Sequence, residues 1–395
     1  MKVISFTGIF GDSVFADPVW SGKMAFNLTK KERVLNTFNF KPVDRPALYD
    51  VVHNLKFIES VYGKTVNSKN AEDAVCCAVA KSLDMVRHFA IPDMLERRIV
   101  RDEDGFVYRK EWWTAEILER PFKTVKEARE LVKKDIFRIR SAIENRRFCR
   151  QAMYNIQLFE DRFDFPEELN SEFERIRNKL DGTVMVAPEQ PESCCYIQTR
   201  YNVDTFIYLL HDFPELTKEL ITAHLDYRLF VIDCLPGPEV TPVAFTGTMA
   251  SGPGGLMFSP DFIFNYLFPS VKKILDRLKE KGYKVIFDFE GDNRKVVDRI
   301  VSLGADALTP VEEISGVSIK QLKEKYPGLV LGFVIDSINL LTGGSAKDVA
   351  KKTMEVIKMA EDYGGILIGS SGALHEKVPV ENALAMINTV KKTRF

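Results

Sequence analysis

A strand-then-helix unit recurs six times through the second half of the chain, and this repeat constrains the fold most. The apolar strand segments lie at residues 183–188, 241–246, 284–289, 306–310, 329–334 and 365–370. A helical pattern follows each, and one helix is opened by Ser259-Pro260, a cap and a first-turn proline. Short, continuously apolar strands are typical of a parallel sheet buried on both faces. The repeat therefore predicts a (β/α)₈ barrel or an open doubly wound sheet.

The first half of the chain supplies the remaining units less regularly. A strand is predicted at 46–52, a helix at 71–85 and a second strand at 86–91. No GxGxxG follows the first strand and no GxxxxGK[ST] occurs, so a nucleotide-binding open sheet has little support. We therefore favour the barrel.

An insertion and an extension complete the predicted organisation. Residues 97–122 alternate about Asp104-Gly105, which predicts a β-hairpin inserted after an early strand. No Gly/Ser linker divides the halves, so we predict one α/β domain over 24–395, a single (β/α)₈ TIM barrel that begins with a helix at about 30–40. We interpret residues 1–23 as an N-terminal extension, for which disorder is one explanation.

Composition and charge exclude several classes of protein. The chain has 395 residues, 45% of them hydrophobic, which supplies a large core and excludes global disorder. Lysine and arginine number 55 against 56 acidic residues, and this balance argues against an electrostatic nucleic-acid binder. No apolar run of about 18 residues occurs, so we expect no membrane span. The N-terminal apolar run is broken by Gly8, Gly11 and Asp12, so we expect no secretion signal and a cytoplasmic location.

Cysteine and histidine usage limits the metal sites that the chain can build. The six cysteines form no CxxC, and the five histidines form no HExxH or HxH. A tetrathiolate or histidine-rich zinc centre is therefore excluded, and a metal would need carboxylates or thiolates.

Candidate site residues follow from the position of active sites in barrels, at the carboxyl ends of the strands. Twelve polar residues lie at such ends: Asp50, His53, Glu189, Thr246, Thr248, Asp288, Glu290, Glu312, Glu313, Asp336, Ser370 and Ser371. From these we select Asp50, His53, Glu189, Thr248, Asp336 and Ser371 as candidate substrate-binding residues.

Asp288 and Glu290 form the best candidate pair. Residues i and i+2 on a strand share a face, so both side chains are expected to point into the barrel mouth. Two carboxylates there could bind a divalent ion such as zinc, or act as acid and base. The alternative is a salt bridge to Arg294 or Lys295.

Two further candidates lie on loops that follow strands. His375 follows the last strand, and a histidine there could act as a catalytic acid or base. Asp336 follows an apolar strand and could contact a ligand, or it could cap the turn before Asn339.

Four collinear blocks resemble the uroporphyrinogen decarboxylase superfamily. The opening block reads KKERVLNTFNFKPVDRPAL at 30–48, and the closing block reads YGGILIGSSGALHEKVPVENALAMI at 363–387. Between them lie GGLMFSPDFIFNYLFPSVKKIL at 254–275 and GFVIDSINLLTGGSAKDV at 332–349. The resemblance spans about 30–392 and implies a (β/α)₈ barrel.

The superfamily holds at least two chemistries, and the resemblance implies which one this chain follows. Authentic decarboxylases carry an arginine-rich loop after the first strand that grips the porphyrinogen carboxylates. Here that place reads YDVVHNLKFIE at 49–59 and holds no arginine, although arginine is the residue that binds carboxylates bidentately. Corrinoid-dependent methyltransferases hold zinc with an H-x-C pair and a late cysteine. Those places read Asp288-Phe289-Glu290 and Ser370-Ser371-Gly372 here, so all three expected ligands are replaced.

The resemblance and these departures together define the expected function. We expect a methyltransferase that moves a methyl group between a small substrate and a corrinoid protein. The alternatives are a decarboxylase of a porphyrinogen or smaller acid, needing no cofactor, and a catalytically silent binding barrel. The expected partners are a small methyl donor or acceptor and a corrinoid protein, and a homodimer stays open.

Overall fold

Eight parallel strands form the centre of the molecule in a computed structural model, which describes residues 27–87, 90–92, 97–149, 164–252 and 254–395. The strands are β1 Ala47–Asp50, β3 Met85–Val86, β7 Val184–Met185, β8 Val243–Gly247, β11 Lys284–Asp288, β12 Ala307–Thr309, β13 Val330–Gly332 and β14 Ile366–Ile368. Neighbours in chain order pair from β1 to β7 and from β8 to β14, and β14 returns to pair with β1. The parallel strand–helix repeat predicted from the sequence is confirmed.

Backbone hydrogen bonds close this sheet into a barrel. The segment that follows β7 donates to β8 three times: Ala187 to Val243, Gln190 to Phe245 and Glu192 to Gly247, at 2.9–3.0 Å. The eight strands therefore run in sequence order around a closed ring, as the (β/α)₈ prediction requires.

The barrel interior is filled by every second residue of the strands. Tyr49, Met85, Phe245 and Ile286 belong to one buried apolar cluster, and the intervening residues pack against the outer helices. Helix α1 Lys30–Phe38 adds Val34 and Phe38 to the same interior cluster. Because α1 contacts β1, β3 and β7, it covers the amino-terminal end of the barrel and leaves the carboxyl end open for a site.

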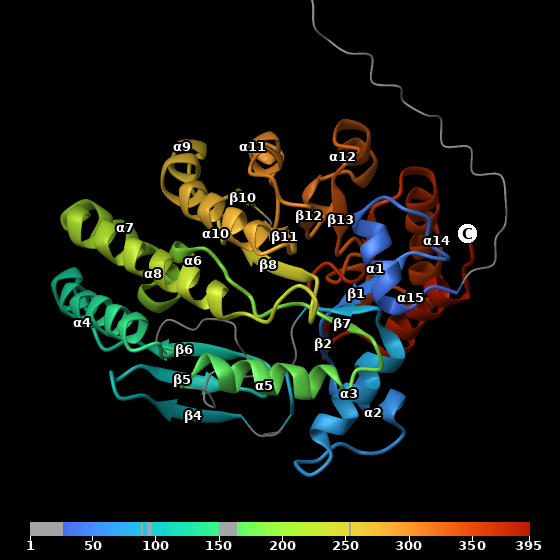
Figure 1. The fold of residues 1–395 in the computed structure, drawn as a ribbon, viewed down its shortest axis with the longest axis horizontal. Coiled ribbons are helices and arrows are strands. Elements are labelled where there is room, and N and C mark those ends of the chain that lie inside the picture. The colour runs from blue at the N-terminus through green and yellow to red at the C-terminus, as the bar shows by residue number, and fades with distance from the viewer. Residues whose placement is uncertain (1–26, 88–89, 93–96, 150–163, 253) are drawn as a thin grey trace, which may run out of the picture.

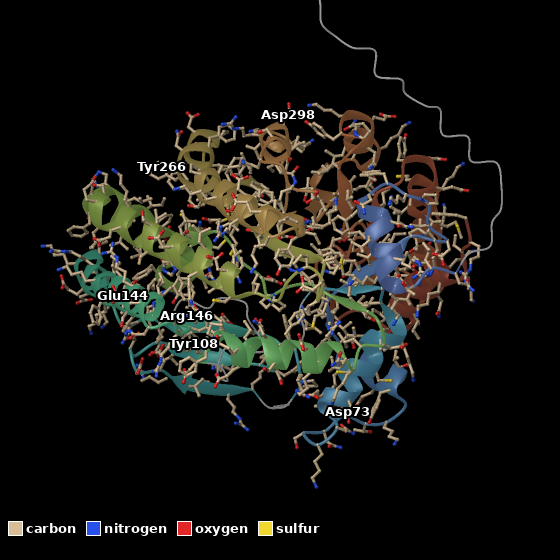
Figure 2. The ribbon with its side chains drawn as sticks, in the orientation of Figure 1. Asp73, Tyr108, Glu144, Arg146, Tyr266 and Asp298 are labelled. Carbon is tan, nitrogen blue, oxygen red and sulfur yellow. The ribbon has the colours of Figure 1, made fainter. Side chains whose placement is uncertain are left out.

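Helices form the outer layer (Figure 1). They are α2 Leu55–Tyr62, α3 Ala71–Ser82, α4 Val125–Glu144, α5 Pro166–Arg177, α6 Ser193–Tyr201, α7 Val203–Asp212, α8 Pro214–Cys234, α9 Pro260–Phe262, α10 Phe268–Glu280, α11 Val297–Ser302, α12 Ile319–Lys325, α13 Leu340–Gly343, α14 Ala346–Tyr363 and α15 Val380–Lys392. Their polar faces project outward, as Asp298 on α11 shows (Figure 2). Among the described residues, no helix is both long and apolar enough to span a membrane.

Several predicted helix signals are present in the structure. The capping box of Thr29 and Glu32 starts α1, and that of Ser345 and Asp348 starts α14. Ser259 caps α9 by accepting from the backbone N–H of Phe262. These side-chain bonds join residues only three positions apart, so signals such as the Ser259-Pro260 cap are visible in the sequence alone.

An acidic side chain anchors the amino-terminal end of the barrel. Asp84 precedes β3, is 1% exposed, and accepts from the guanidinium groups of Arg33 (2.8 Å) and Arg45 (2.6 and 2.9 Å). It also accepts from the backbone N–H of Leu48 at 2.8 Å, and Arg33 binds Asp44 through two further bonds of 2.7 Å. Residues of the opening block that resembles the superfamily therefore stabilise the amino-terminal end of the barrel.

The predicted insertion is a three-stranded antiparallel sheet rather than a single hairpin. It comprises β4 Arg98–Arg101, β5 Val107–Lys110 and β6 Ala115–Glu119, and Gly105 turns β4 into β5 with a φ of 93°. Asp104 in that turn accepts from Arg138 on α4 and Arg200 on α6 at 2.6 and 2.8 Å. These charged bonds fix the insertion to the outer helices.

Two predicted elements differ from the structure. The strand predicted at 86–91 overlaps the two-residue β3 Met85–Val86, and residues 88–89 of the predicted range lie outside the described residues. The helix predicted at 203–235 is two helices, because Pro214 starts α8 and cannot continue the hydrogen bonding of α7. The predicted extension at 1–23 lies outside the described residues.

Candidate active site at the barrel mouth

An ion-paired arginine lies at the centre of the barrel mouth. Arg87 follows β3 and donates to both carboxylate oxygens of Glu189, Nε to Oε1 at 2.9 Å and an NH2 hydrogen to Oε2 at 3.2 Å. Its other terminal nitrogen lies 3.9 Å from Oδ1 of Asp288, and the guanidinium lies 3.9 Å above the Phe245 ring. Burial is tolerated because the charge has two carboxylate neighbours, which raise the pKa of Arg87 above its usual value despite desolvation.

Asp288 is placed to exchange a proton with a ligand in the mouth. It is the last residue of β11, and its side chain is 10% exposed. Thr309 donates its hydroxyl to Oδ1 at 2.9 Å. Burial raises the pKa of Asp288 to about 7 against the lowering effect of Arg87, and the Glu290 charge adds to the rise. A carboxyl with this pKa can act as acid or base near neutral pH.

Gly247 at the end of β8 makes room for this carboxyl. A Cβ atom built there would lie 2.8 Å from the Cβ of Asp288, closer than real contacts allow. A side chain at 247 would displace Asp288, so the site requires glycine at this strand end.

The Tyr49 hydroxyl lies within the same polar group without a hydrogen bond of its own. Tyr49 is fully buried, its ring stacks on Phe333 at 4.5 Å, and its hydroxyl has no partner. Burial raises the pKa of Tyr49 well above its usual value, and its charged neighbours are Arg87, Glu189, Asp288 and Asp50. A buried unpaired hydroxyl is costly, so it marks a place where a ligand or water would be bound.

Asp50 faces away from this interior group. On β1, Tyr49 belongs to the interior cluster while Leu48 packs with the outer one, so Asp50 shares the outward face. It accepts from the backbone N–H and hydroxyl of Ser370 at 2.8 and 2.6 Å and from the N–H of Val51 at 2.7 Å. Burial still raises the pKa of Asp50 to about 7. These bonds give Asp50 a structural role, joining β1 to the end of β14.

A second group of carboxylates lies on the rim. Glu290 is exposed, and Glu312 accepts from the N–H of Gly291 at 2.9 Å. Burial raises the pKa of Glu312, and the charges of Glu290 and Asp336 add to the rise, so the three carboxylates lie close together. Asp336 also caps its own loop by accepting from the N–H groups of Ile338 and Asn339, which is the capping role that the sequence left open. Ser371 lies beside it and contacts Ser337 at 3.2 Å.

Both candidate histidines lie together at another part of the rim. His53 on β2 Val52–His53 pairs in parallel with His375 on β15 Leu374–His375. Trp113 from the insertion stacks on the His53 ring at 5.0 Å, and Trp112 lies edge-on at 5.9 Å. His375 is half-buried and accepts from the N–H of Lys377 through Nδ1, and burial lowers its pKa. This pair packs against the inserted sheet through Trp112 and Trp113, whereas Asp288 lies beside Arg87 and Thr309, so the described contacts place His375 and Asp288 in different groups.

Thr248 lies next to the site, but its hydroxyl is hydrogen-bonded to the buried side chain of Glu192. It donates to Glu192 Oε1 at 3.1 Å, while its backbone N–H donates to the carbonyl of Asp288 at 3.1 Å. Burial raises the pKa of Glu192 to about 7. Thr248 therefore supports the position of Asp288 through the backbone.

The structure therefore divides the candidate residues into groups. Asp288 and Glu189 meet at the centre, Glu290, Asp336 and Ser371 lie on the rim, and Asp50 and Thr248 face structural partners. Sequence reasoning missed Tyr49 and Arg87. The alternation of β1 was a usable signal for Tyr49, whereas Arg87 was hidden within a strand predicted to continue to residue 91.

Asp288 and Glu290 do not fit the divalent-metal site predicted for them. A metal at Asp288 would lie close to the Arg87 guanidinium, and Oδ1 already accepts from Thr309. Across the described ranges, no group of three or more His, Cys, Asp or Glu side chains is placed to hold a metal ion. The reaction proposed below therefore gives no role to a metal ion.

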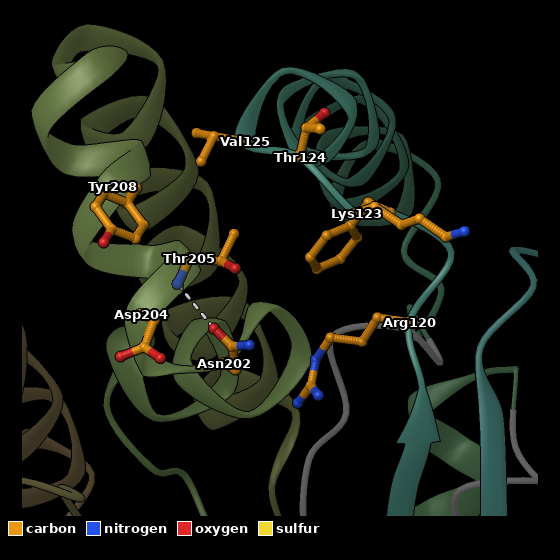
Figure 3. A pocket seen from close by; sticks show the side chains of 9 residues that line it. Arg120, Lys123, Thr124, Val125, Asn202, Asp204, Thr205 and Tyr208 are labelled. Atoms are coloured by element: carbon orange, nitrogen blue, oxygen red, sulfur yellow. Dashed lines mark hydrogen bonds between the residues drawn. The ribbon is translucent and has the colours of Figure 1, made fainter.

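Two cavities of about 430 Å³ lie away from the centre of the mouth. One lies between the start of α4 and α7 and is lined by Arg120, Lys123, Asn202, Asp204 and Tyr208 (Figure 3). Asn202 there accepts from the backbone N–H of Thr205 at 2.7 Å, so its amide oxygen is used in capping α7. The other lies beside the rim, between the loops after β12 and β13 and α14. We place the chemistry at the mouth because the buried unpaired hydroxyl and the carboxyl that titrates near neutrality lie there.

The raised pKa of Asp288 predicts how stability changes with pH. Folded protein keeps this proton from about pH 4 to 7, where the unfolded chain has released it, so stability falls as pH rises through that window. Asp288→Asn removes the titration. Relative to wild type, its free energy of unfolding should rise by about 1–3 kcal/mol from about pH 5 to 7, because one pKa unit is about 1.4 kcal/mol.

Urea unfolding at several pH values measures this difference. Asp50 and Glu192, whose pKa values burial also raises to about 7, titrate in both proteins and cancel. Parallel stability curves for the two proteins would contradict a raised pKa at Asp288.

Comparisons with known proteins agree with this architecture. Residues 254–393 match the family model described as uroporphyrinogen decarboxylase (URO-D). Among solved structures, a methyltransferase from Methanosarcina mazei aligns over 93% of this chain and 99% of its own, with a TM-score of 0.63 and 14% identity. A type I 3-dehydroquinate dehydratase from Clostridium difficile aligns over 57% of this chain and 76% of its own, with a TM-score of only 0.30 and 10% identity. No curated protein sequence matches the chain significantly. The comparisons confirm the predicted resemblance of this chain to the uroporphyrinogen decarboxylase superfamily, carried in sequence by residues 254–393 and in fold by the closed (β/α)₈ barrel.

Proposed function

We propose that the chain is a methyltransferase that moves a methyl group between a small substrate and a corrinoid protein at the mouth around Asp288. One observation carries this choice over porphyrinogen decarboxylation. Among the residues that the structure describes, the centre of the mouth offers one guanidinium, Arg87, which is already bound bidentately by Glu189. A substrate with eight carboxylates would need several free cations. The fold likeness to a methyltransferase, over nearly the full length of both chains, supports the choice.

The residues of the mouth have separable roles in this reaction. A heteroatom whose lone pair carries a proton must lose that proton before it can attack the methyl group, and Asp288 is the group that can accept it. Arg87 holds Asp288 in a polar environment and keeps part of its population ionised near neutral pH. The electron pair of the broken methyl–cobalt bond stays with the corrinoid, so the bonds and charges balance.

The rim suits contact with a large partner. Exposed apolar side chains follow several strands: Met249, Met257, Ile314 and Ile338. Exposed apolar side chains in loops that follow barrel strands are available for contact with another macromolecule. This supports a corrinoid delivered by another protein.

Methylcobalamin can stand in for the corrinoid protein in a direct test. Purified protein is incubated with methylcobalamin and, in turn, dimethylamine, homocysteine and 2-mercaptoethanesulfonate. We expect methylcobalamin absorbance to fall and one methylated product to appear by mass spectrometry. The same preparation should leave uroporphyrinogen III unchanged.

Two results would contradict the proposal. Carbon dioxide release from the porphyrinogen or a smaller carboxylic acid, with methylcobalamin untouched, would indicate a decarboxylase. No consumption of any compound would indicate a catalytically silent barrel.

A further inference from the structure

In the described part of the mouth, carboxylates outnumber the guanidinium groups that could neutralise them. Arg87 is shared by Glu189 and Asp288. In the part of the chain that the structure describes, Glu290, Glu312 and Asp336 have no ion-pair partner, and the nearby Lys352 pairs with Glu313 at 2.5 Å. An anionic substrate would meet uncompensated negative charge here, and a cationic one would relieve it.

The Tyr49 hydroxyl is an independent sign of a ligand below these carboxylates. It is fully buried, has no hydrogen-bond partner, and lies among Arg87, Glu189 and Asp288. A hydroxyl with a free lone pair can accept a hydrogen bond from an N–H donor. Glu312 and Asp336 also line the neighbouring cavity of about 430 Å³, where five carboxylates outnumber the two ammonium groups of Lys351 and Lys352.

We propose that the substrate is a small organic cation, an alkylammonium ion, bound by Asp288, Glu290 and Glu312 with its N–H directed to Tyr49. This inference rests on the proposed function, in which the amine is the methyl acceptor and gives its proton to Asp288. A compact organic cation suits the site better than a metal ion, because it needs dispersed negative charge and acceptors rather than three converging ligands.

Titration calorimetry with dimethylammonium chloride tests the proposal, with sodium chloride at equal ionic strength as the blank. Wild type should bind it saturably. The double variant Glu290→Gln with Glu312→Gln should bind at least about tenfold more weakly, since two nearby charges are lost. Glu361→Gln, an exposed carboxylate near the carboxyl end of α14 and outside the lining of that cavity, is the matched control and should bind as wild type does.

Tyr49→Phe separates the hydrogen bond from the charge. It should weaken dimethylammonium binding about threefold to tenfold and leave tetramethylammonium binding unchanged, because that ion has no N–H. The variant should unfold at or above the wild-type temperature, since it removes an unsatisfied buried hydroxyl.

Tighter binding of acetate or 2-mercaptoethanesulfonate than of dimethylammonium would overturn the inference, as would unchanged affinity in the double variant or in Tyr49→Phe. Methyl transfer from methylcobalamin to an anionic thiol alone would also overturn it while leaving the proposed function intact. Saturable ammonium binding with no methyl transfer to any acceptor would support the cation site and contradict the proposed function.

Discussion

Asp84→Ala is expected to lower the free energy of unfolding by about 3–5 kcal/mol. The side chain is 1% exposed and accepts four hydrogen bonds, three of them from the guanidinium groups of Arg33 and Arg45. Alanine would leave Arg45 buried without a carboxylate partner, and Leu48 at the start of the first barrel strand would lose its acceptor. Urea unfolding followed by circular dichroism measures the loss.

Asp73→Ala is the matched control. Asp73 lies on α3, and its largely exposed side chain pairs with Lys179 at 2.9 Å (Figure 2). A surface pair of this kind contributes about 0–1 kcal/mol. If Asp84→Ala cost no more than Asp73→Ala, Asp84 would not be the anchor of the amino-terminal end.

The barrel was predictable because its signal is local and repeated. A strand buried on both faces is continuously apolar, so runs such as 243–247 and 284–288 are visible without any partner. The two-residue strand β3 carries little of this signal, whereas β7 lies within the apolar run predicted at 183–188. The apolar residues Phe89, Ala90 and Ile91 follow Arg87-His88 in the sequence, so the predicted strand extends beyond the end of β3 at Val86.

The site was only partly predictable because its partners are far apart in sequence. Asp288 is found from its strand end alone. Its environment depends on Arg87, about 200 residues earlier, and on Glu189, about 100 residues from Arg87. No spacing rule joins these positions, since they meet only when the ring of strands closes.

Strand alternation explains why Asp50 was selected and Tyr49 was missed. The strand-end rule favours polar residues and takes no account of which face they occupy. The Asp50 side chain points away from the barrel interior and towards Ser370, which follows β14. Its neighbour Tyr49 points into the interior. If the two-residue alternation of a strand had been applied at each strand end, Tyr49 would have been selected in place of Asp50.

Asp288→Asn is expected to reduce methyl transfer by about 10²–10⁴-fold, the usual effect of removing a general base. Asparagine keeps the shape and can still accept from Thr309, so the fold should be retained. The variant loses the ability to take the substrate proton. In wild type the rate should rise with pH about a midpoint near 7, where the Asp288 carboxyl ionises, and that rise should be absent from the variant.

The most direct measurement is the rate of methylcobalamin consumption by wild type and Asp288→Asn, side by side with the same acceptor and pH series. The account predicts turnover in wild type, a loss of at least about a hundredfold in the variant, and unfolding temperatures that match within a few degrees. Equal rates in the two proteins, or no methylcobalamin consumption by wild type with any acceptor, would contradict a methyl-transfer site at the barrel mouth.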